Sequence, residues 1–384
     1  MTATSVYVHF PWCLKKCPYC DFNSYGTARD DVPHDAYADA VLRELDARRA
    51  QLEGRTLVSI FVGGGTPSLW DPRALGRVLA GIEGAFGARV DDVEVTVECN
   101  PTSLDRARAA AMREAGVNRI SIGVQSLDAS RLKFLGRLHD APMALSAVRE
   151  ARREITRVSA DLMFGMPGQK AQDFEAELDR VLETGVDHVS AYALTIEPGT
   201  QFGELHKKGR LPVAPDDDYA ETFLAAESMF ASRGLEHYEV SNYARPGQEA
   251  RHNLHYWRGG DYVGLGAGAV GCLGDGRGGA RRWRDEALPA KYLESSGELA
   301  RVESWEESLS AEDRVREALM LGLRTREGVD LDALEARTGV DARVGRERAI
   351  ERRVGRGELV MEGARMRVPH ASWLALDAIV TDLF

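Results

Sequence analysis

The feature that most constrains the fold is an alternation of short apolar runs with longer helix-like stretches, repeated six times. Each apolar run is rich in β-branched residues and is followed by helical spacing of apolar residues, which is the pattern of consecutive βα units. The strands are expected at SVYVHF, LVSIFVGG, VEVTVEC, RISIGVQ, RVSADLMFG and HVSAYAL, and the helices at 35–52, 71–84, 105–115, 141–153, 171–183 and 216–233. Six units in a row predict an α/β fold with a parallel sheet, and favour a partial (β/α)6 TIM-like barrel.

Three segments are predicted along the 384 residues. The barrel is expected over 1–235. Over 236–304 the sequence becomes Gly-rich and aromatic, and it is expected to form loops or irregular strands that close the sheet. Residues 305–384 predict three helices followed by a β-hairpin. That order resembles a winged helix, so a mainly helical C-terminal domain is expected there.

Composition and charge limit which binding partners and which cellular compartment are expected for the protein. The formal net charge is −11, so the protein as a whole does not attract the negatively charged phosphate backbone, and no nucleic acid partner is expected. The start lacks the pattern of a signal peptide, and no apolar run reaches the roughly 20 residues of a membrane span. A cytoplasmic protein with at most peripheral membrane contact is therefore expected.

Polar residues and glycines gather where the predicted strands end. In a parallel barrel these carboxyl ends form one rim, where binding groups collect. Taken singly, each residue has a structural explanation, such as a tight turn or a helix cap; together they predict a pocket. The residues, in strand order, are Cys13, Cys17 and Cys20; Gly63 to Pro67; Glu98 and Asn100; Gln125 and Ser126; Asp161; Tyr192 and Ala193.

Three of the five cysteines form the pattern C-x3-C-x2-C, which lets three thiolates converge on one inorganic centre. In a reducing compartment such a group indicates metal binding or redox chemistry rather than disulfides. A zinc site would need a fourth ligand; His139 or His9 could serve, although nothing in their spacing recommends them. A [4Fe–4S] cluster on three thiolates leaves one iron open to a substrate or cofactor. The spacing favours the cluster, and a zinc-stabilised scaffold remains the alternative.

The cysteine loop, with Tyr19 beside its last cysteine, resembles the radical S-adenosylmethionine (SAM) enzymes. A closer resemblance is to the HemW heme chaperones, relatives of the oxygen-independent coproporphyrinogen III oxidases (HemN), and it extends from about residue 5 to the C-terminus. It rests on HFPWCLKKCPYCDFNSY, FVGGGTPSL, VECNP, RISIGVQS, ADLMFGMPGQ, YALTIEPGT, HYEVSNYA and HNLHYW.

This resemblance implies cofactors and their ligands. Cys13, Cys17 and Cys20 would hold a [4Fe–4S] cluster, and the amino and carboxylate groups of SAM would occupy the free iron. The implied SAM contacts, some of them to a second SAM, are Tyr7, Tyr19, Gly64, Gly65, Thr66, Glu98, Gln125, Arg137, Asp161 and Ala193. If the protein is catalytic, an electron donor would drive reductive cleavage of SAM to a 5′-deoxyadenosyl radical.

Two departures separate this chain from the oxidases. The oxidases continue the motif to a fourth cysteine, where this chain has Phe22, and they carry an N-terminal extension before the first strand. The resemblance therefore implies a heme chaperone that passes heme to acceptor hemoproteins. The alternative is a coproporphyrinogen III oxidase of porphyrin biosynthesis.

The segment HNLHYW, residues 252–257, bears on heme directly. The family carries a related motif tied to heme binding, so His252 is the candidate axial ligand of the iron. Tyr256 and Trp257 would lie against the flat macrocycle. His255 is a rival ligand, and the structural alternative is a loop that packs its aromatic side chains on the barrel.

Overall fold

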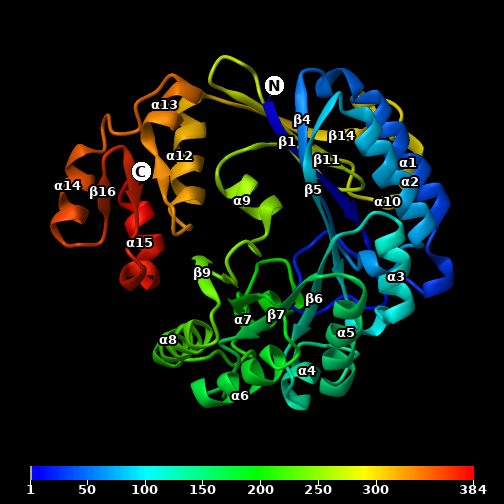
Figure 1. The fold of residues 1–384 in the computed structure, drawn as a ribbon, viewed down its shortest axis with the longest axis horizontal. Coiled ribbons are helices and arrows are strands. Elements are labelled where there is room, and N and C mark those ends of the chain that lie inside the picture. Colours follow the sequence, from blue (N-terminus) through cyan, green and yellow to red (C-terminus); the bar gives the residue numbers. More distant parts are fainter. Residues whose placement is uncertain (1) are drawn as a thin grey trace.

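The computed structural model describes residues 2–384, which form a large curved sheet with helices along its outer face and a helical C-terminal segment at one side (Figure 1). Six parallel strands lie side by side in chain order, which confirms the predicted partial (β/α)6 barrel. They are β1 (Thr2–Phe10), β4 (Arg55–Gly64), β5 (Ala88–Cys99), β6 (Arg119–Gln125), β7 (Arg157–Phe164) and β8 (His188–Ala193).

The six predicted helices are also present, each following its strand. They are α1 (His34–Ala47), α2 (Pro72–Ala85), α3 (Arg106–Glu114), α5 (Ala141–Glu154), α6 (Ala171–Leu182) and α8 (Asp216–Ser232). Aspartate side chains begin several of them: Asp71, Asp105 and Asp140 accept hydrogen bonds from the first free backbone N–H groups of α2, α3 and α5. Two short helices, α4 (Ala129–Phe134) and α7 (Gln201–Lys207), lie in the connections.

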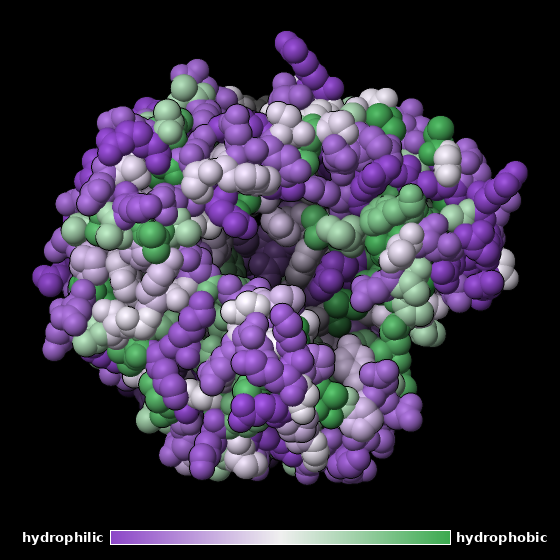
Figure 2. Space-filling view, turned by 180° about the vertical axis from the view of Figure 1, so that it is seen from behind, coloured by the Kyte–Doolittle hydropathy of each residue, from purple (hydrophilic) through white to green (hydrophobic). Residues whose placement is uncertain are grey.

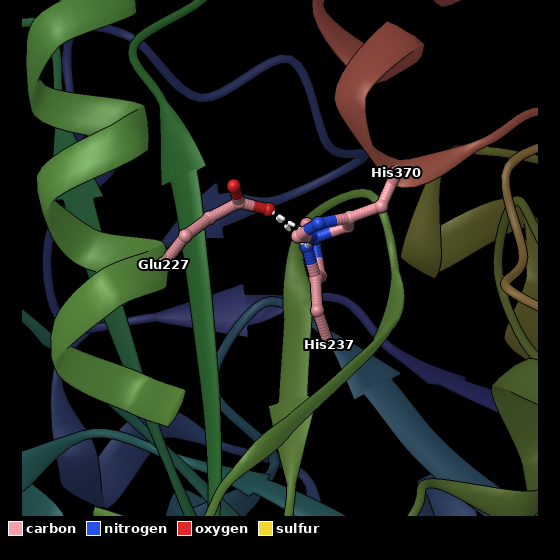
Figure 3. A group of neighbouring side chains, drawn as sticks. All are labelled: Glu227, His237 and His370. Carbon is pink, nitrogen blue, oxygen red and sulfur yellow. Dashed lines mark hydrogen bonds and ion pairs between the residues drawn. The ribbon is translucent and has the colours of Figure 1, made fainter. Parts of the chain in front are cut away.

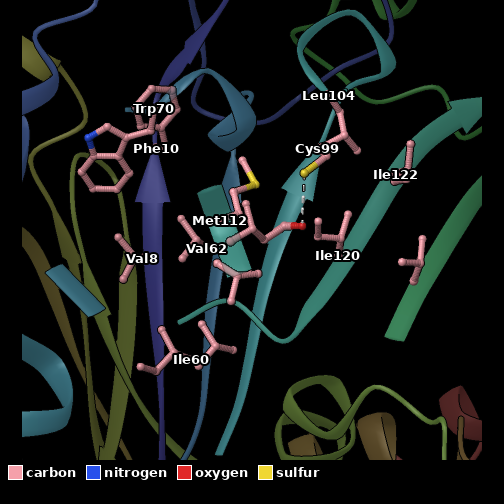
Figure 4. Close-up of a cluster of buried hydrophobic side chains, with 14 of the residues drawn as sticks. Val8, Phe10, Ile60, Val62, Trp70, Cys99, Leu104, Met112, Ile120 and Ile122 are labelled. Atoms are coloured by element: carbon pink, nitrogen blue, oxygen red, sulfur yellow. Dashed lines mark hydrogen bonds between the residues drawn. The ribbon is translucent and has the colours of Figure 1, made fainter. Parts of the chain in front are cut away.

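The main hydrophobic core fills the space between the sheet and these helices, and Figure 4 shows part of it. Alternate residues of β1 and β4, among them Val8, Phe10, Ile60 and Val62, point into this core and are fully buried. Because side chains alternate across a strand, the residues between them point to the inner face of the sheet. The core thus determines which side chains of each strand face the interior of the barrel.

The segment after β8 widens the sheet at both sides instead of closing it. Next to β8 lie β10 (Asn242–Ala244) and β9 (Glu236–Glu239), both antiparallel. Next to β1 lies β11 (Asp261–Leu265), which is parallel to it, followed by antiparallel β12 (Val270–Gly274), β13 (Ala280–Asp285) and β14 (Glu303–Leu309). Helices α9 (Arg251–Trp257), α10 (Pro289–Ser295) and α11 (Leu299–Val302) connect these strands.

Regular strands therefore occur where loops or irregular strands were expected. Several glycines of this segment are present because neighbouring groups lie too close for a side chain, rather than because the chain turns. A Cβ at Gly271 would lie 2.1 Å from the ring of Trp283, and one at Gly264 would lie 2.3 Å from the carbonyl oxygen of Val270.

The C-terminal segment has a hydrophobic cluster of its own, which includes Leu319, Trp373 and Ile379. Its elements are α12 (Ala311–Gly322), β15 (Val329–Asp330), α13 (Leu331–Thr338), α14 (Glu347–Gly355), β16 (Val360–Glu362), β17 (Arg365–Arg367) and α15 (Leu376–Thr381). Three helices followed by a hairpin match the predicted order. Among residues 2–384, no helix has the length and apolar character needed to span a membrane.

Candidate functional site

The cysteine loop is held at the carboxyl end of β1 by a small two-stranded sheet. Strands β2 (Trp12–Cys13) and β3 (Tyr25–Gly26) pair on either side of the loop, and the N–H of Cys20 donates to the carbonyl of Cys17 at 3.2 Å. All three thiols are free and line one cavity of about 310 Å³. The predicted convergence of Cys13, Cys17 and Cys20 is therefore present.

Most of the predicted SAM-contact residues line the same cavity. Those that do are Tyr19, Gly64, Gly65, Thr66, Glu98, Gln125, Arg137 and Asp161. Tyr7 and Ala193 lie outside it. The Tyr7 hydroxyl is instead 2.9 Å from Nδ1 of His9, while Ala193 ends β8 beside Phe164.

The surroundings of the three sulfur atoms suit an iron–sulfur cluster. Thr66 Oγ1 donates to Cys13 Sγ at 3.4 Å, and the Arg137 guanidinium donates to Cys17 Sγ at 3.6 Å. Burial raises the pKa of Cys13 and of Cys20, and a coordinated metal would override this because it deprotonates a thiol outright. No histidine lines this cavity, and the fourth cysteine that does, Cys99 on β5, lies outside the cysteine loop and donates its S–H to the carbonyl of Val97 at 3.7 Å. Three thiolates from one loop fit an open iron cluster better than a closed zinc site.

Two carboxyl groups face this cavity from β5 and β7, the strands on either side of β6. Glu98 accepts a hydrogen bond from the N–H of Gly64 at 3.1 Å, and Asp161 accepts one from Ser121 Oγ at 3.0 Å. Burial, and then the charge of Asp161, raise the pKa of Glu98 to about 7; burial also raises the pKa of Asp161. Two buried carboxyls without a bound cation are costly, so the cavity favours a cationic ligand.

The glycine turn after β4 brings the backbone against the cysteine loop. The N–H of Gly65 donates to the carbonyl of Phe10 at 2.7 Å, and the N–H of Thr66 donates to that of Trp12 at 2.8 Å. Gly64 has φ +109°, and a Cβ there would lie 2.5 Å from the His9 ring. Only glycine fits this position without strain.

Sequence reasoning missed three polar residues inside the barrel. Arg119 and Ser121 on β6 and Ser190 on β8 line the cavity together with the predicted residues. Strand alternation contained the signal, because 119, 121, 123 and 125 share one face. Arg119 is 2% exposed and makes no direct ion pair with a carboxylate within residues 2–384, but its charge helps to lower the pKa of buried Glu94 and also acts on Asp161.

A second cavity of about 790 Å³ borders the first, and Phe22 lines both. Its walls come from β1, the cysteine loop, α9, the strands β11, β12 and β13, and α12 of the C-terminal segment. Figure 2 shows that the molecule is hollowed near the centre of the face seen from behind. The lining residues include His252, Tyr256, Tyr262, Arg282, Arg284, Lys16, Met320 and Leu321.

The residues of HNLHYW form helix α9 rather than a loop, and their side chains have different surroundings. Nδ1 of His252 lies 3.0 Å from Ser59 Oγ, and burial lowers the pKa of His252 to about 3. Its Nε2 has no hydrogen-bond partner within residues 2–384. In contrast, Nε2 of His255 lies 2.9 Å from the carbonyl of Asp261, and Trp257 lies beside Tyr238 outside both cavities.

Comparisons with known proteins agree with this geometry. Residues 7–181 match the model of the radical SAM superfamily, and residues 309–374 match that of the HemN C-terminal domain. The heme chaperone HemW of Escherichia coli is 43% identical over 277 residues, 71% of each chain. HemW of Mycobacterium tuberculosis is 37% identical over 380 residues, 98% of this chain and 94% of that one.

The chain belongs to the HemW family of radical SAM proteins. Its fold also matches a solved structure, that of coproporphyrinogen III oxidase (HemN) from Escherichia coli, a radical SAM enzyme. The TM-score is 0.81 at 20% identity, over 100% of this chain and 90% of that one. At this identity the match shows the shared fold alone, so function within the HemW family has to be argued from the site.

Proposed function

We propose that this protein binds heme in the second cavity and transfers it to acceptor hemoproteins, with a [4Fe–4S] cluster and SAM in the neighbouring first cavity. The observation that carries the proposal is the second cavity itself. It combines a buried neutral histidine with aromatic walls and cationic side chains, and it borders the cysteine cavity at Phe22.

The chemistry of the second cavity suits an iron porphyrin. A neutral imidazole with a free nitrogen is the usual axial ligand of heme iron, and Nε2 of His252 meets that description. Tyr256 and Tyr262, with ring centroids 5.0 Å apart, offer apolar faces to the macrocycle. Lys16 and Arg284 can neutralise propionates, and the volume lies within the roughly 300 to 1,000 Å³ of typical cofactor sites.

The other two histidines near this cavity are poorer ligands. Both ring nitrogens of His9 are engaged, one 2.9 Å from the Tyr7 hydroxyl and one 2.7 Å from the carbonyl of Asn23. Nε2 of His255 is engaged with Asp261, as described above. His252 is therefore favoured over its rival.

In the first cavity, Cys13, Cys17 and Cys20 would hold the cluster. Glu98 and Asp161 would face the positive charges of SAM, and Arg119 is placed to bind an anionic group. When bound, the cluster supplies one iron open to SAM and a route for a low-potential electron. The protein's own contribution is to exclude water, orient SAM and supply opposite charges. The proposal places the protein in the cytoplasm, where its thiols stay reduced; an electron donor is needed only if SAM is cleaved.

Heme titration of the purified full-length protein tests the proposal. The wild type is expected to give a shifted Soret band that His252→Ala weakens and that His206→Ala, a change at an exposed histidine on α7, leaves unchanged. Folding of the variants is checked by circular dichroism. A wild type that gives no Soret shift, or a His252→Ala variant identical to it, would refute heme binding at this site.

The alternative function is oxygen-independent coproporphyrinogen III oxidase. The fold is shared with HemN, which at 20% identity assigns no activity, and Phe22 in place of a fourth cysteine argues against the oxidase. The Phe22 side chain is 54% exposed at the boundary of the two cavities, where it takes no part in binding the cluster. Formation of protoporphyrinogen IX from coproporphyrinogen III under anaerobic reducing conditions would favour the oxidase.

A further inference from the structure

Away from both cavities, three side chains with metal-binding atoms converge where the C-terminal segment meets the edge of the sheet. Glu227 projects from α8, His237 from β9, and His370 from a 3-10 helix over His370–Ala375 (Figure 3). Nδ1 of His237 lies 2.7 Å from Oε1 of Glu227 and 2.9 Å from Nε2 of His370. Oε1 of Glu227 also contacts Nε2 of His370, so the three atoms form a closed triangle.

With Glu227 ionised, no placement of protons satisfies all three contacts of this triangle. An imidazole nitrogen is either a donor or an acceptor, never both. If both nitrogens donate to the carboxylate, two N–H groups face each other across 2.9 Å. If one nitrogen accepts from the other, its lone pair faces the carboxylate oxygen. Only a proton held on Glu227 and donated to one nitrogen, with the N–H of the other nitrogen shared between Glu227 and the first, would avoid the conflict. With an ionised carboxylate, hydrogen bonding alone does not explain the arrangement.

A cation bound by the three atoms, once they separate to the spacing of metal ligands, removes the conflict because each atom then offers a lone pair to one positive charge. We propose that Glu227, His237 and His370 bind a divalent first-row metal ion of the Zn²⁺ class and thereby fasten the C-terminal segment to the edge of the sheet. Two imidazoles and one carboxylate are a common protein ligand set for zinc, and they leave a fourth position for water or another small ligand.

The surroundings hold the ligands in place. The His237 ring stacks on the Tyr243 ring with their centroids 4.1 Å apart. It packs edge-on against the Trp373 ring with centroids 4.2 Å apart, so packing fixes its orientation. Arg326 lies nearby, and its ion pair with Glu236 offsets the repulsion between the guanidinium and a bound cation.

The position of the site indicates its role. The backbone already joins β9 to the C-terminal segment, since the N–H of Arg326 donates to the carbonyl of Tyr238 at 3.0 Å. A metal held by His370 would add a second attachment at another point of that segment. A cavity of about 620 Å³ borders all three ligands, so an ion can reach them from solvent.

The experiment uses full-length protein with its cluster reconstituted, so that Cys13, Cys17 and Cys20 do not compete for Zn²⁺. Zinc is titrated against a chromogenic competitor into the wild type, Glu227→Gln, His370→Ala and the control His206→Ala. Hydrogen exchange of residues 365–384 is followed with and without zinc. The wild type and the control are expected to bind about one Zn²⁺ per chain, with slower exchange over 365–384.

Either ligand variant is expected to weaken zinc binding by at least about 100-fold, more than the loss of a group outside the ligand set causes, and to lose the protection. Because Glu227→Gln changes little in shape and the His370 side chain is 53% exposed, at least one variant should fold normally. A wild type that binds no zinc, or variants that bind it as tightly as the control, would overturn the proposal.

Discussion

Replacing Glu98 with glutamine is expected to stabilise the ligand-free protein while weakening its affinity for SAM. The ordinary pKa of the Glu98 carboxyl is 4.5, and burial together with the charge of Asp161 raises it to about 7. As pH rises through this interval, the unfolded chain loses the proton before the folded chain does, so ionisation favours unfolding. The resulting loss of stability is absent below pH 4.5 and complete above about pH 7.

The size of the effect follows from the shift. Each pKa unit corresponds to about 1.4 kcal/mol, so the penalty has an upper bound of roughly 3 kcal/mol. The Glu98 carboxyl lines a cavity that water can enter, and water screens its charge. We therefore expect ionisation of Glu98 to cost about 2 kcal/mol of folding stability at pH 8. Glutamine avoids this penalty and can still accept the hydrogen bond from the N–H of Gly64. It has no negative charge for a sulfonium, so SAM affinity should fall by about 10-fold or more.

Urea unfolding of the cluster-free chain at pH 5 and pH 8 measures the stability, with Glu335→Gln on the exposed face of α13 as the control. The gain from Glu98→Gln should be small at pH 5 and large at pH 8, and the control should show neither. A variant less stable than the wild type at pH 8, or a gain that does not depend on pH, would refute the reasoning.

Three other substitutions test separate parts of the account. Cys17→Ala should abolish the brown colour and iron content of anaerobically reconstituted protein, whereas a colourless zinc-containing wild type would favour the zinc scaffold. Gly64→Ala, at φ +109°, should destabilise the fold by about 1–3 kcal/mol in urea unfolding, while Gly84→Ala on α2, where a Cβ meets nothing within 4 Å, should not. Arg48→Met should lower the free energy of unfolding by about 3–5 kcal/mol in the same measurement, because buried Glu44 and Asp285 lose their ion-pair partner. Each of these carboxylates lies 2.7 Å from the guanidinium of Arg48. An unchanged stability would contradict this prediction.

The barrel and its rim could be predicted because both follow from local patterns. Each β-branched run marks a strand, and parallel strands bring Cys13, Gly64, Glu98 and Asp161 to the same end of the sheet. The inward position of Arg119 was missed although Arg119, Ser121 and Gln125 alternate with apolar residues along β6, because a buried arginine is rare and arginine usually marks an exposed position.

The second cavity and the three-ligand cluster were beyond sequence reasoning for a different reason. Phe22 meets Met320 and Leu321 across the second cavity only after the sheet has widened past β1. His237 and His370 are 133 residues apart and meet only when the C-terminal segment packs on β9. Contacts of this kind depend on packing between distant segments, so no local pattern of residues in the sequence indicates them. The helix α9 was missed because its polar and aromatic residues show no apolar period.

The most direct test of heme transfer as the function combines two readings on one sample of anaerobically reconstituted wild-type protein. Heme is titrated while the Soret band is followed, and a parallel portion is supplied with coproporphyrinogen III, SAM and a low-potential reductant. We predict a shifted Soret band that saturates at about one heme per chain, the single site offered by His252, with no protoporphyrinogen IX formed. Turnover to protoporphyrinogen IX without a Soret shift would contradict the account.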